Sequence, residues 1–165
     1  MKIFYKSMII IILFIVNKNN IFSQSYIDSL CISKSKRKLQ AFTKGHLVLT
    51  CNIGLGKNAV GNKREEGDGK TPEGLYFING RSDKSLYNKA LSISYPSNFD
   101  KALAKKRKLK AGSNIEIHGL PKGYKDEGVL KVMPDWTLGC IAIKNKDIEV
   151  LYKLVRAQCT VLILP

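Results

Sequence analysis

The sequence predicts a mainly β fold that forms one domain and carries one or two short helices. Short apolar segments that alternate with polar residues recur along the chain and are separated by tight turns. Only two segments are predicted to be helical, and no linker, repeat or low-complexity tract follows residue 24. A chain of 165 residues is expected to form one domain with a substantial core.

The N-terminal segment differs from the rest in composition. Lys2 and Lys6 flank an apolar run of nine residues, Met8 to Val16, and polar residues follow it. Nine residues are too few to cross a bilayer as a helix, but they match the apolar region of a secretory signal. We therefore expect residues 1–24 to be a signal peptide and residues 25–165 to be an exported domain in the periplasm or cell envelope. The alternatives are a retained membrane anchor, which would be the chain's only membrane contact, and a buried helix of the domain.

The first strands are expected at residues 29–33, 38–42 and 46–53. Short polar turns join them, so they are expected to pair in antiparallel fashion. His46 opens the third strand beside a turn, which favours a solvated structural role over a catalytic one.

Residues 54–74 are rich in glycine and charge and predict a long loop. Gly69-Lys70-Thr71 has the form of the end of a phosphate-binding loop, but Arg64 stands where the first glycine is required. Ala59 likewise takes the place of the third glycine of a dinucleotide-binding motif. The segment is therefore either a plain surface turn or the border of a functional cleft.

The later part of the chain is predicted to alternate between strands and helices. Ser97 and Asn145 are the expected helix N-caps. Strands are expected at residues 75–79, 90–95, 114–118 and 160–164, helices at 97–109 and 145–155, and an irregular loop at 120–134.

The chain is strongly basic. Its net charge is +15, and removal of residues 1–24 with their three lysines would leave +12. The densest cationic run, residues 105–110, contains no aromatic residue for stacking on bases, so no nucleic acid partner is predicted. The run is interpreted as the solvated face of a helix, and anionic cell-wall polymers are the partners that an exported cationic surface would meet.

Cys140 lies where a loop is expected to enter a strand. Gly139 precedes it and the alternating residues 141–143 follow it. The missing Cβ of Gly139 would let a substrate backbone approach the sulfur. The thiol is either a nucleophile held on a packed strand or a small buried core residue.

A histidine at the end of another predicted strand favours the nucleophile. His118 is followed by Gly119 and lies 22 positions before Cys140, so a loop that folds back could bring imidazole and sulfur together. A thiol is mostly protonated near neutral pH and needs a base. We expect His118 to take the proton of Cys140.

These motifs resemble those of the L,D-transpeptidase catalytic domain family, cysteine enzymes that remodel bacterial peptidoglycan. The matching residues are His118-Gly119 and Thr137-Leu138-Gly139-Cys140. The strings from Asp135 to Ala142 and from Glu66 to Gly74 are similar to one branch of the family. The resemblance covers about residues 29–164 and implies a β-sandwich of mixed sheets.

The resemblance also implies the roles of individual residues. Cys140 would be the nucleophile and His118 the general acid and base, oriented by the backbone carbonyl of Gly119. The backbone amides of Gly139 and Cys140 would bind the oxyanion. The remaining implied contacts are with substrate, from Asp135, Trp136 and Thr137 beside the cysteine and from Thr71, Pro72 and Gly74 in the long loop; Trp136 is equally well explained as core.

Two residues depart from the family pattern. Leu138 stands where many members have a second histidine, and Ala142 stands where many have arginine or asparagine. Neither is the predicted nucleophile or base, so the departures bear on substrate binding.

The substrates implied by the resemblance are peptidoglycan stem peptides. The acyl donor would be a tetrapeptide stem that loses its terminal D-residue. Transfer to an amine would give a crosslink, whereas transfer to water would make the domain a carboxypeptidase or endopeptidase, and the sequence leaves both open. The alternative to an enzyme is a non-catalytic exported module that binds anionic wall polymers.

The other cysteines are Cys31, Cys51 and Cys159, each in an apolar strand-like segment. An oxidising compartment permits one bridge among them, and three reduced core cysteines are the alternative. No Cys-x-x-Cys or His-Glu-x-x-His motif occurs, so neither a metal site nor a cofactor is predicted.

Overall fold

The computed structural model of the chain describes residues 26–84, 86–125 and 135–165. The signal-peptide prediction and most of the predicted loop at 120–134 lie outside these residues. The described strands are β1 Ile27–Ser33, β2 Lys38–Thr43, β3 His46–Asn52, β4 Gly74–Ser82, β5 Ala90–Ile93, β6 Glu116–His118, β7 Ile141–Ala142 and β8 Val155–Leu164. The described helices are α1 Asn98–Lys106 and α3 Asn145–Leu154.

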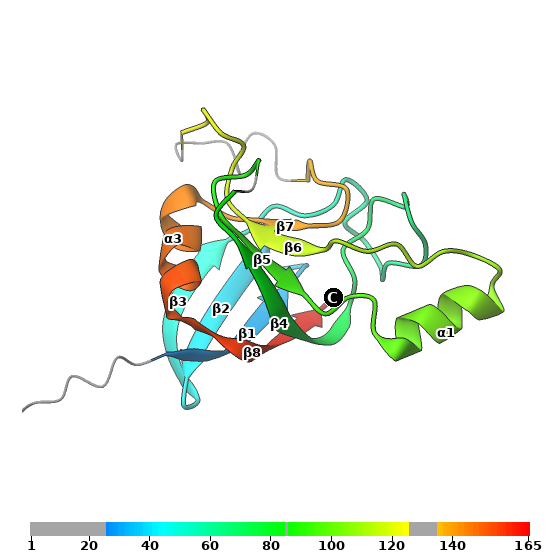
Figure 1. Cartoon of the computed structure of the whole chain (residues 1–165), viewed down its shortest axis with the longest axis horizontal. Helices are drawn as coiled ribbons and strands as arrows, with labels where there is room; N and C mark the ends of the chain where they lie inside the picture. The colour runs from blue at the N-terminus through cyan, green and yellow to red at the C-terminus, as the bar shows by residue number, and fades with distance from the viewer. Residues whose placement is uncertain (1–25, 85, 126–134) are drawn as a thin grey trace, which may run out of the picture.

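All eight strands belong to one mixed sheet in the order β3-β2-β1-β8-β4-β5-β6-β7. The prediction of a mainly β fold is confirmed. Strands β1, β2 and β3 form the expected antiparallel meander, whereas β1 pairs with β8 and β6 pairs with β7 in parallel. The sheet curls, so that its two ends face each other across the interior (Figure 1).

Strand β4 lies in the middle of the sheet and joins its two halves. Its first residues, from Gly74 to Phe77, pair with β8, and its later residues, from Ile78 to Ser82, pair with β5. A register shift between Ile78 and Gly80 marks the change of partner. One strand therefore connects the β1-β2-β3-β8 half of the sheet to the β5-β6-β7 half, which carries the two residues predicted to be catalytic.

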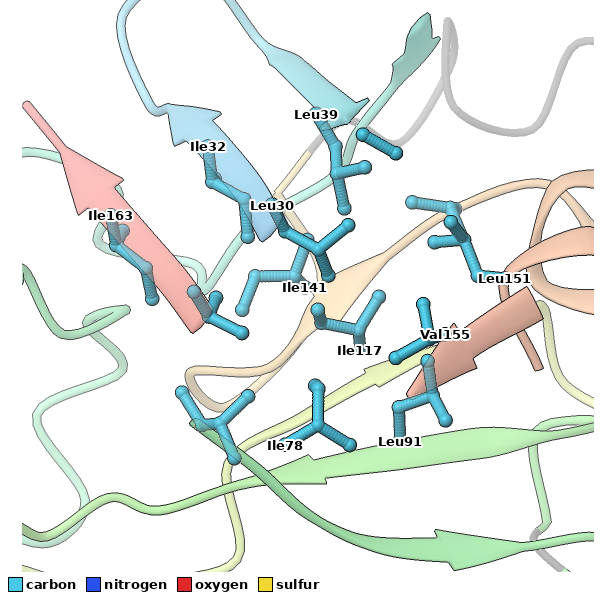
Figure 2. Packing of buried hydrophobic residues seen from close by; sticks show 14 of the residues in the cluster. Leu30, Ile32, Leu39, Ile78, Leu91, Ile117, Ile141, Leu151, Val155 and Ile163 are labelled. Atoms are coloured by element: carbon cyan, nitrogen blue, oxygen red, sulfur yellow. The ribbon is translucent and has the colours of Figure 1, made fainter. Parts of the chain in front are cut away.

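Apolar residues from both halves fill the interior. Figure 2 shows Leu30 of β1, Ile163 of β8, Ile117 of β6 and Ile141 of β7 packed around one space, and each is 0–1% exposed. Burial of this many branched side chains is the main stabilising term of such a domain. The same packing fixes β6 and β7 next to each other.

Helices α1 and α3 lie at opposite ends of the molecule (Figure 1). Ser97 caps α1 as predicted, and Asp100 completes a capping box with it. The predicted Asn145 cap of α3 is wrong, because Lys144 is the N-cap residue and makes no side-chain capping bond. The Asn145 Oδ1 atom instead accepts a hydrogen bond of 2.9 Å from the Leu120 backbone N–H.

The four cysteines are free thiols, so the alternative of a bridge among Cys31, Cys51 and Cys159 is wrong for this structure. The basic residues 105–110 are exposed, as expected for a solvated segment. His46 is also exposed at the start of β3. Among the described residues, no helix has the length and apolar character that a membrane span requires.

Candidate active site

Strands β6 and β7 place His118 and Cys140 on the same side of the sheet. Ile117 pairs with Ile141 and His118 pairs with Ala142, and the two isoleucines point into the core. Successive side chains along a strand point to opposite faces, so His118 and Cys140 both point away from that core. In ideal strands, positions with this offset have Cα atoms roughly 8 Å apart, which long side chains can bridge.

Both residues line one cavity of about 470 Å³. Its lining includes His118, Cys140 and Thr137 from the preceding turn. The other lining residues are Lys63, Glu66, Gly67, Tyr87, Gly112, Ser113, Asn114, Ile115 and Leu138. The residues predicted to form a catalytic pair are therefore brought together in a space large enough for a peptide segment.

The His118 ring is fixed by a hydrogen bond to its neighbour. His118 Nδ1 lies 2.7 Å from the Gly119 carbonyl oxygen, and a carbonyl can only accept. Nδ1 therefore carries the hydrogen, and in the neutral ring Nε2 is left as a proton acceptor. Burial lowers the pKa of His118 below its ordinary value of 6.5, and the bond to Gly119 opposes this shift.

The segment after His118 is held against α3. A Cβ at Gly119 would lie 2.6 Å from Asn145 Oδ1 and 3.1 Å from Ile148 Cγ2, so only glycine fits there. The Gly119 N–H donates to the Lys89 carbonyl. These contacts fix the peptide unit whose carbonyl oxygen orients the imidazole.

Two aromatic rings surround the imidazole. Tyr87 stacks on His118 with a centroid distance of 4.2 Å, and Trp136 meets it edge-on at 5.6 Å. Tyr87 and Trp136 also contact each other at 5.6 Å. The rings exclude water from the faces of the imidazole, and this desolvation contributes to its lowered pKa.

Cys140 is partly buried and retains polar neighbours. Its Sγ lies 3.5 Å from the Asn114 carbonyl oxygen. Burial raises the pKa of the Cys140 thiol above 9.0, and the Glu116 backbone N–H opposes this. The Glu116 carboxylate raises the pKa further, whereas the Lys63 ammonium lowers it. Since the pKa of His118 falls and that of Cys140 rises, the resting pair is a neutral thiol and a neutral imidazole.

Thr137 holds the turn that presents the sulfur. Its Oγ1 donates to the Cys140 carbonyl at 2.8 Å and accepts from the Gly139 N–H at 3.1 Å. The Gly139 amide, expected to serve the oxyanion, already has this acceptor. The Cys140 N–H has no acceptor among the described residues.

The structure gives a different reason for glycine at position 139 than the expected approach of a substrate backbone. The position of a Cβ at Gly139 would be 2.7 Å from the Lys70 carbonyl oxygen and 3.1 Å from Ile115 Cδ1. The space beside the sulfur is thus filled by the chain's own loop rather than left for a substrate backbone. Gly139 also has φ of +136°, a conformation that L side chains rarely adopt.

Gly139→Ala is expected to destabilise the domain by about 2–4 kcal/mol, because strain from positive φ and a clash with Lys70 add together. The measurement is the free energy of unfolding in denaturant. Gly45→Ala is the matched control, since Gly45 has φ of +79° but no atom within 4 Å of its Cβ position. The free energy of unfolding of Gly45→Ala should fall by only about 1 kcal/mol. Equal decreases in the two variants would contradict the close approach of Lys70 to Gly139.

The long loop at residues 54–74 borders the cavity through Lys63, Glu66 and Gly67. Thr71, Pro72 and Gly74, predicted as substrate contacts, do not line it. Thr71 is fully buried, and its Oγ1 accepts from the Gly56 N–H at 3.2 Å. Because that hydroxyl joins two parts of the loop, Thr71 stabilises the loop from within.

Asp135 also lies outside the cavity wall. Its carboxylate accepts from Arg37 Nη2 at 2.5 Å and from the Leu55 N–H at 3.3 Å. Trp136 contacts His118 without lining the cavity, and of this predicted group only Thr137 does so. Asp135 therefore fastens its segment to the turn between β1 and β2 and to the loop that follows β3.

The sequence interpretation missed several lining residues. Tyr87 lies in a connection between strands with no recognisable motif, and Asn114 has φ of +58°, which brings its carbonyl to the sulfur. Lys63 belongs to a charged loop, and nothing in the sequence indicates that its side chain is buried, with 3% exposure. Within the described residues, no group of three or more histidine, cysteine, aspartate or glutamate side chains could hold a metal ion.

Comparison with known protein families finds a match over most of the chain. The family model described as YkuD, L,D-transpeptidase catalytic domain, matches residues 27–163. The chain belongs to the L,D-transpeptidase catalytic domain family. This L,D-transpeptidase-family domain is also similar to the putative L,D-transpeptidase YafK of Escherichia coli strain K12, with 27% identity over 130 residues, 75% of this chain and 45% of the relative.

Solved structures share the fold of this L,D-transpeptidase-family domain. Bd1075 of Bdellovibrio bacteriovorus matches with a TM-score of 0.59 and 26% identity, over 87% of this chain and 50% of that one. The helical cell shape determining protein Pgp2 of Campylobacter jejuni matches with a TM-score of 0.62 and 24% identity, over 85% of this chain and 50% of that one. The chain thus spans about half the length of these relatives.

Proposed function

We propose that the domain is a cysteine acyltransferase that acts on peptidoglycan stem peptides through a thioester on Cys140. One observation carries the proposal. His118 donates its Nδ1 hydrogen to the Gly119 carbonyl, which leaves Nε2 as the proton acceptor, and His118 lines the same cavity as Cys140. This is the arrangement of an oriented base and a nucleophile.

Acylation begins when Cys140 attacks the carbonyl on the carboxyl side of the L centre of an L,D amide bond. The thiol proton moves to His118 Nε2 as the S–C bond forms, because both groups are neutral at rest. The C–N bond then breaks, and Nε2 returns the proton to the leaving amine. The products are a thioester and the released D-residue.

The oxyanion of the tetrahedral intermediate needs an N–H donor. The Cys140 N–H suits this role, since it has no acceptor among the described residues. The Gly139 N–H would have to be shared with Thr137 Oγ1. We therefore assign the main donor to Cys140 and a supporting one to Gly139.

The second step is transfer to an amine on another stem, which breaks the S–C bond, forms a new amide and returns a proton to sulfur through His118. Water in place of the amine gives the hydrolase alternative, a carboxypeptidase or an endopeptidase. Leu138 lines the cavity and is 71% exposed, so solvent reaches this part of the cavity rim. Both outcomes use the same Cys140 chemistry.

Purified protein incubated with a tetrapeptide stem and a stem amine acceptor tests the proposal, with the products read by mass. A crosslinked product supports transpeptidation, and a tripeptide alone supports the hydrolase alternative. Intact stems after incubation with folded protein would contradict transpeptidation and the carboxypeptidase, and an intact crosslinked dimer in the same assay would contradict the endopeptidase. Retained binding to isolated cell walls in that case would support the non-catalytic module, whose contact surface would be the exposed cations at residues 105–110.

The proposed site of action is the periplasm or cell envelope, since peptidoglycan lies outside the cytoplasmic membrane and residues 1–24 carry the pattern of a secretory signal. Cell fractionation tests the location. Recovery of the mature chain in the cytoplasmic fraction would contradict it.

The pH dependence of kcat/KM is expected to show an acidic limb with a midpoint below 6.5. The pKa of His118 is lowered, so the imidazole stays neutral as pH falls through 6.5. The imidazole becomes protonated, and activity falls, only in more acidic solution. The pKa of Cys140 is raised above 9.0, so the thiol stays protonated across the neutral range. Initial rates at low substrate concentration from pH 4 to 9 give the profile; a midpoint above 6.5 would contradict a buried neutral base.

A further inference from the structure

Lys63 is a buried cation in the wall of the catalytic cavity. Its side chain is only 3% exposed, yet it lines the cavity together with Cys140 and His118. Burial of an ammonium group is costly unless its charge and its three N–H donors are satisfied. The Lys63 ammonium therefore needs acceptors from the loop or from the cavity.

Two of the three donors of Lys63 are satisfied by the loop itself. Nζ donates to the Glu65 carbonyl at 3.0 Å and to Asp68 Oδ1 at 2.8 Å. No third acceptor occurs among the described residues. Since Lys63 lines the cavity, one N–H remains for a group that enters or forms there.

Asp68 holds the ammonium in place. Its carboxylate accepts backbone N–H bonds from Arg64, Glu65 and Lys70, at 2.7, 3.2 and 3.0 Å. Although burial acts to raise the pKa of Asp68, these bonds and the Lys63 ammonium lower it overall. A carboxylate anchored at several points leaves the Lys63 head group little freedom to leave the cavity wall.

The strand that follows Cys140 supplies no cation. Ile141, Ala142 and Ile143 are fully buried, and Ala142 exchanges backbone hydrogen bonds with Gly54. Glu66 is the other charged lining residue, and its charge opposes a thiolate. Among the charged side chains that act on Cys140, Glu116 disfavours the sulfur anion and Lys63 favours it.

We propose that Lys63 is an electrostatic positioning residue of the site, which stabilises the Cys140 sulfur anion as His118 removes its proton. The catalytic consequence rests on the proposed function, but the effect on the thiol does not. A fixed positive charge at a desolvated site acts strongly because little water screens it.

The test is the pH dependence of Cys140 alkylation by iodoacetamide, with the modified peptide read by mass. Lys63→Met, which keeps the approximate length of the side chain but not its charge, is expected to shift the midpoint of alkylation to higher pH and to slow alkylation at neutral pH. Lys63→Arg should restore most of the rate.

Lys34→Met is the matched control. Lys34 is also a buried lysine, 4% exposed, and it pairs with Glu73 at 2.7 Å, but it does not line the catalytic cavity. Its variant should lose stability and keep the wild-type alkylation profile. If Lys63→Met matches Lys34→Met in this profile, the proposal is overturned.

A second variant keeps the proposal falsifiable if Lys63→Met fails to fold. Lys63→Gln, which keeps a polar head group without the charge, must then shift the alkylation midpoint to higher pH, and an unchanged or lower midpoint overturns the proposal. Alkylation requires no peptidoglycan. A protein that leaves stem peptides intact but shows these shifts contradicts the proposed function and supports the role of Lys63.

Discussion

Cys140→Ala is expected to reduce turnover of stem peptides by at least about 10³-fold while the fold is retained. Cys140 is the cavity-lining residue that we assign as the nucleophile, and alanine has no group that can form the thioester. Loss of one half-buried sulfur should change the free energy of unfolding by less than about 1 kcal/mol. Product formation by mass and unfolding in denaturant measure the two effects separately.

Cys31→Ala is the matched control for this variant. Cys31 is also a free and partly buried thiol, but it lies on β1 and does not line the cavity. Its substitution should leave turnover unchanged. Wild-type turnover by Cys140→Ala would contradict the assignment of the nucleophile.

His118→Gln should lower kcat/KM by about 10³-fold, because the raised pKa of Cys140 leaves the thiol protonated without a base. Glutamine preserves the approximate size and polarity of the side chain but cannot accept and release a proton. The effect should appear at all pH values below the pKa of the thiol. A rate that recovers at high pH would identify the missing function as proton removal.

His46→Gln is the control, since His46 is exposed at the start of β3 and distant from β6 in the strand order. It should retain wild-type kcat/KM. If His118→Gln changes KM alone and leaves kcat intact, the imidazole binds substrate rather than moving a proton.

Much of the fold was predictable because alternation and turn residues are local signals. The meander of β1, β2 and β3 followed from three alternating segments with short turns between them. Ser97 identified the start of α1, because its hydroxyl and Asp100 form a capping box within four residues. The parallel pairings of β8 with β1 and of β7 with β6 were not predicted, since they depend on contacts between distant segments.

The catalytic pair could be proposed from motifs, whereas the surrounding wall could not. His118-Gly119 and Gly139-Cys140 each carry a local signature. Lys63 and Tyr87 reach the site through a long loop and an irregular connection, whose course depends on tertiary packing. Asn145 shows the same limit, because its side chain closes the turn after His118 instead of capping its own helix.

The most direct measurement of the central claim is the mass of protein quenched in acid during incubation with a tetrapeptide stem. The account predicts an adduct equal to the acyl part of the stem, located on the peptide that contains Cys140, and its absence in His118→Gln over the same interval. Consumption of the stem with unmodified Cys140, or an adduct on any other residue, would contradict it.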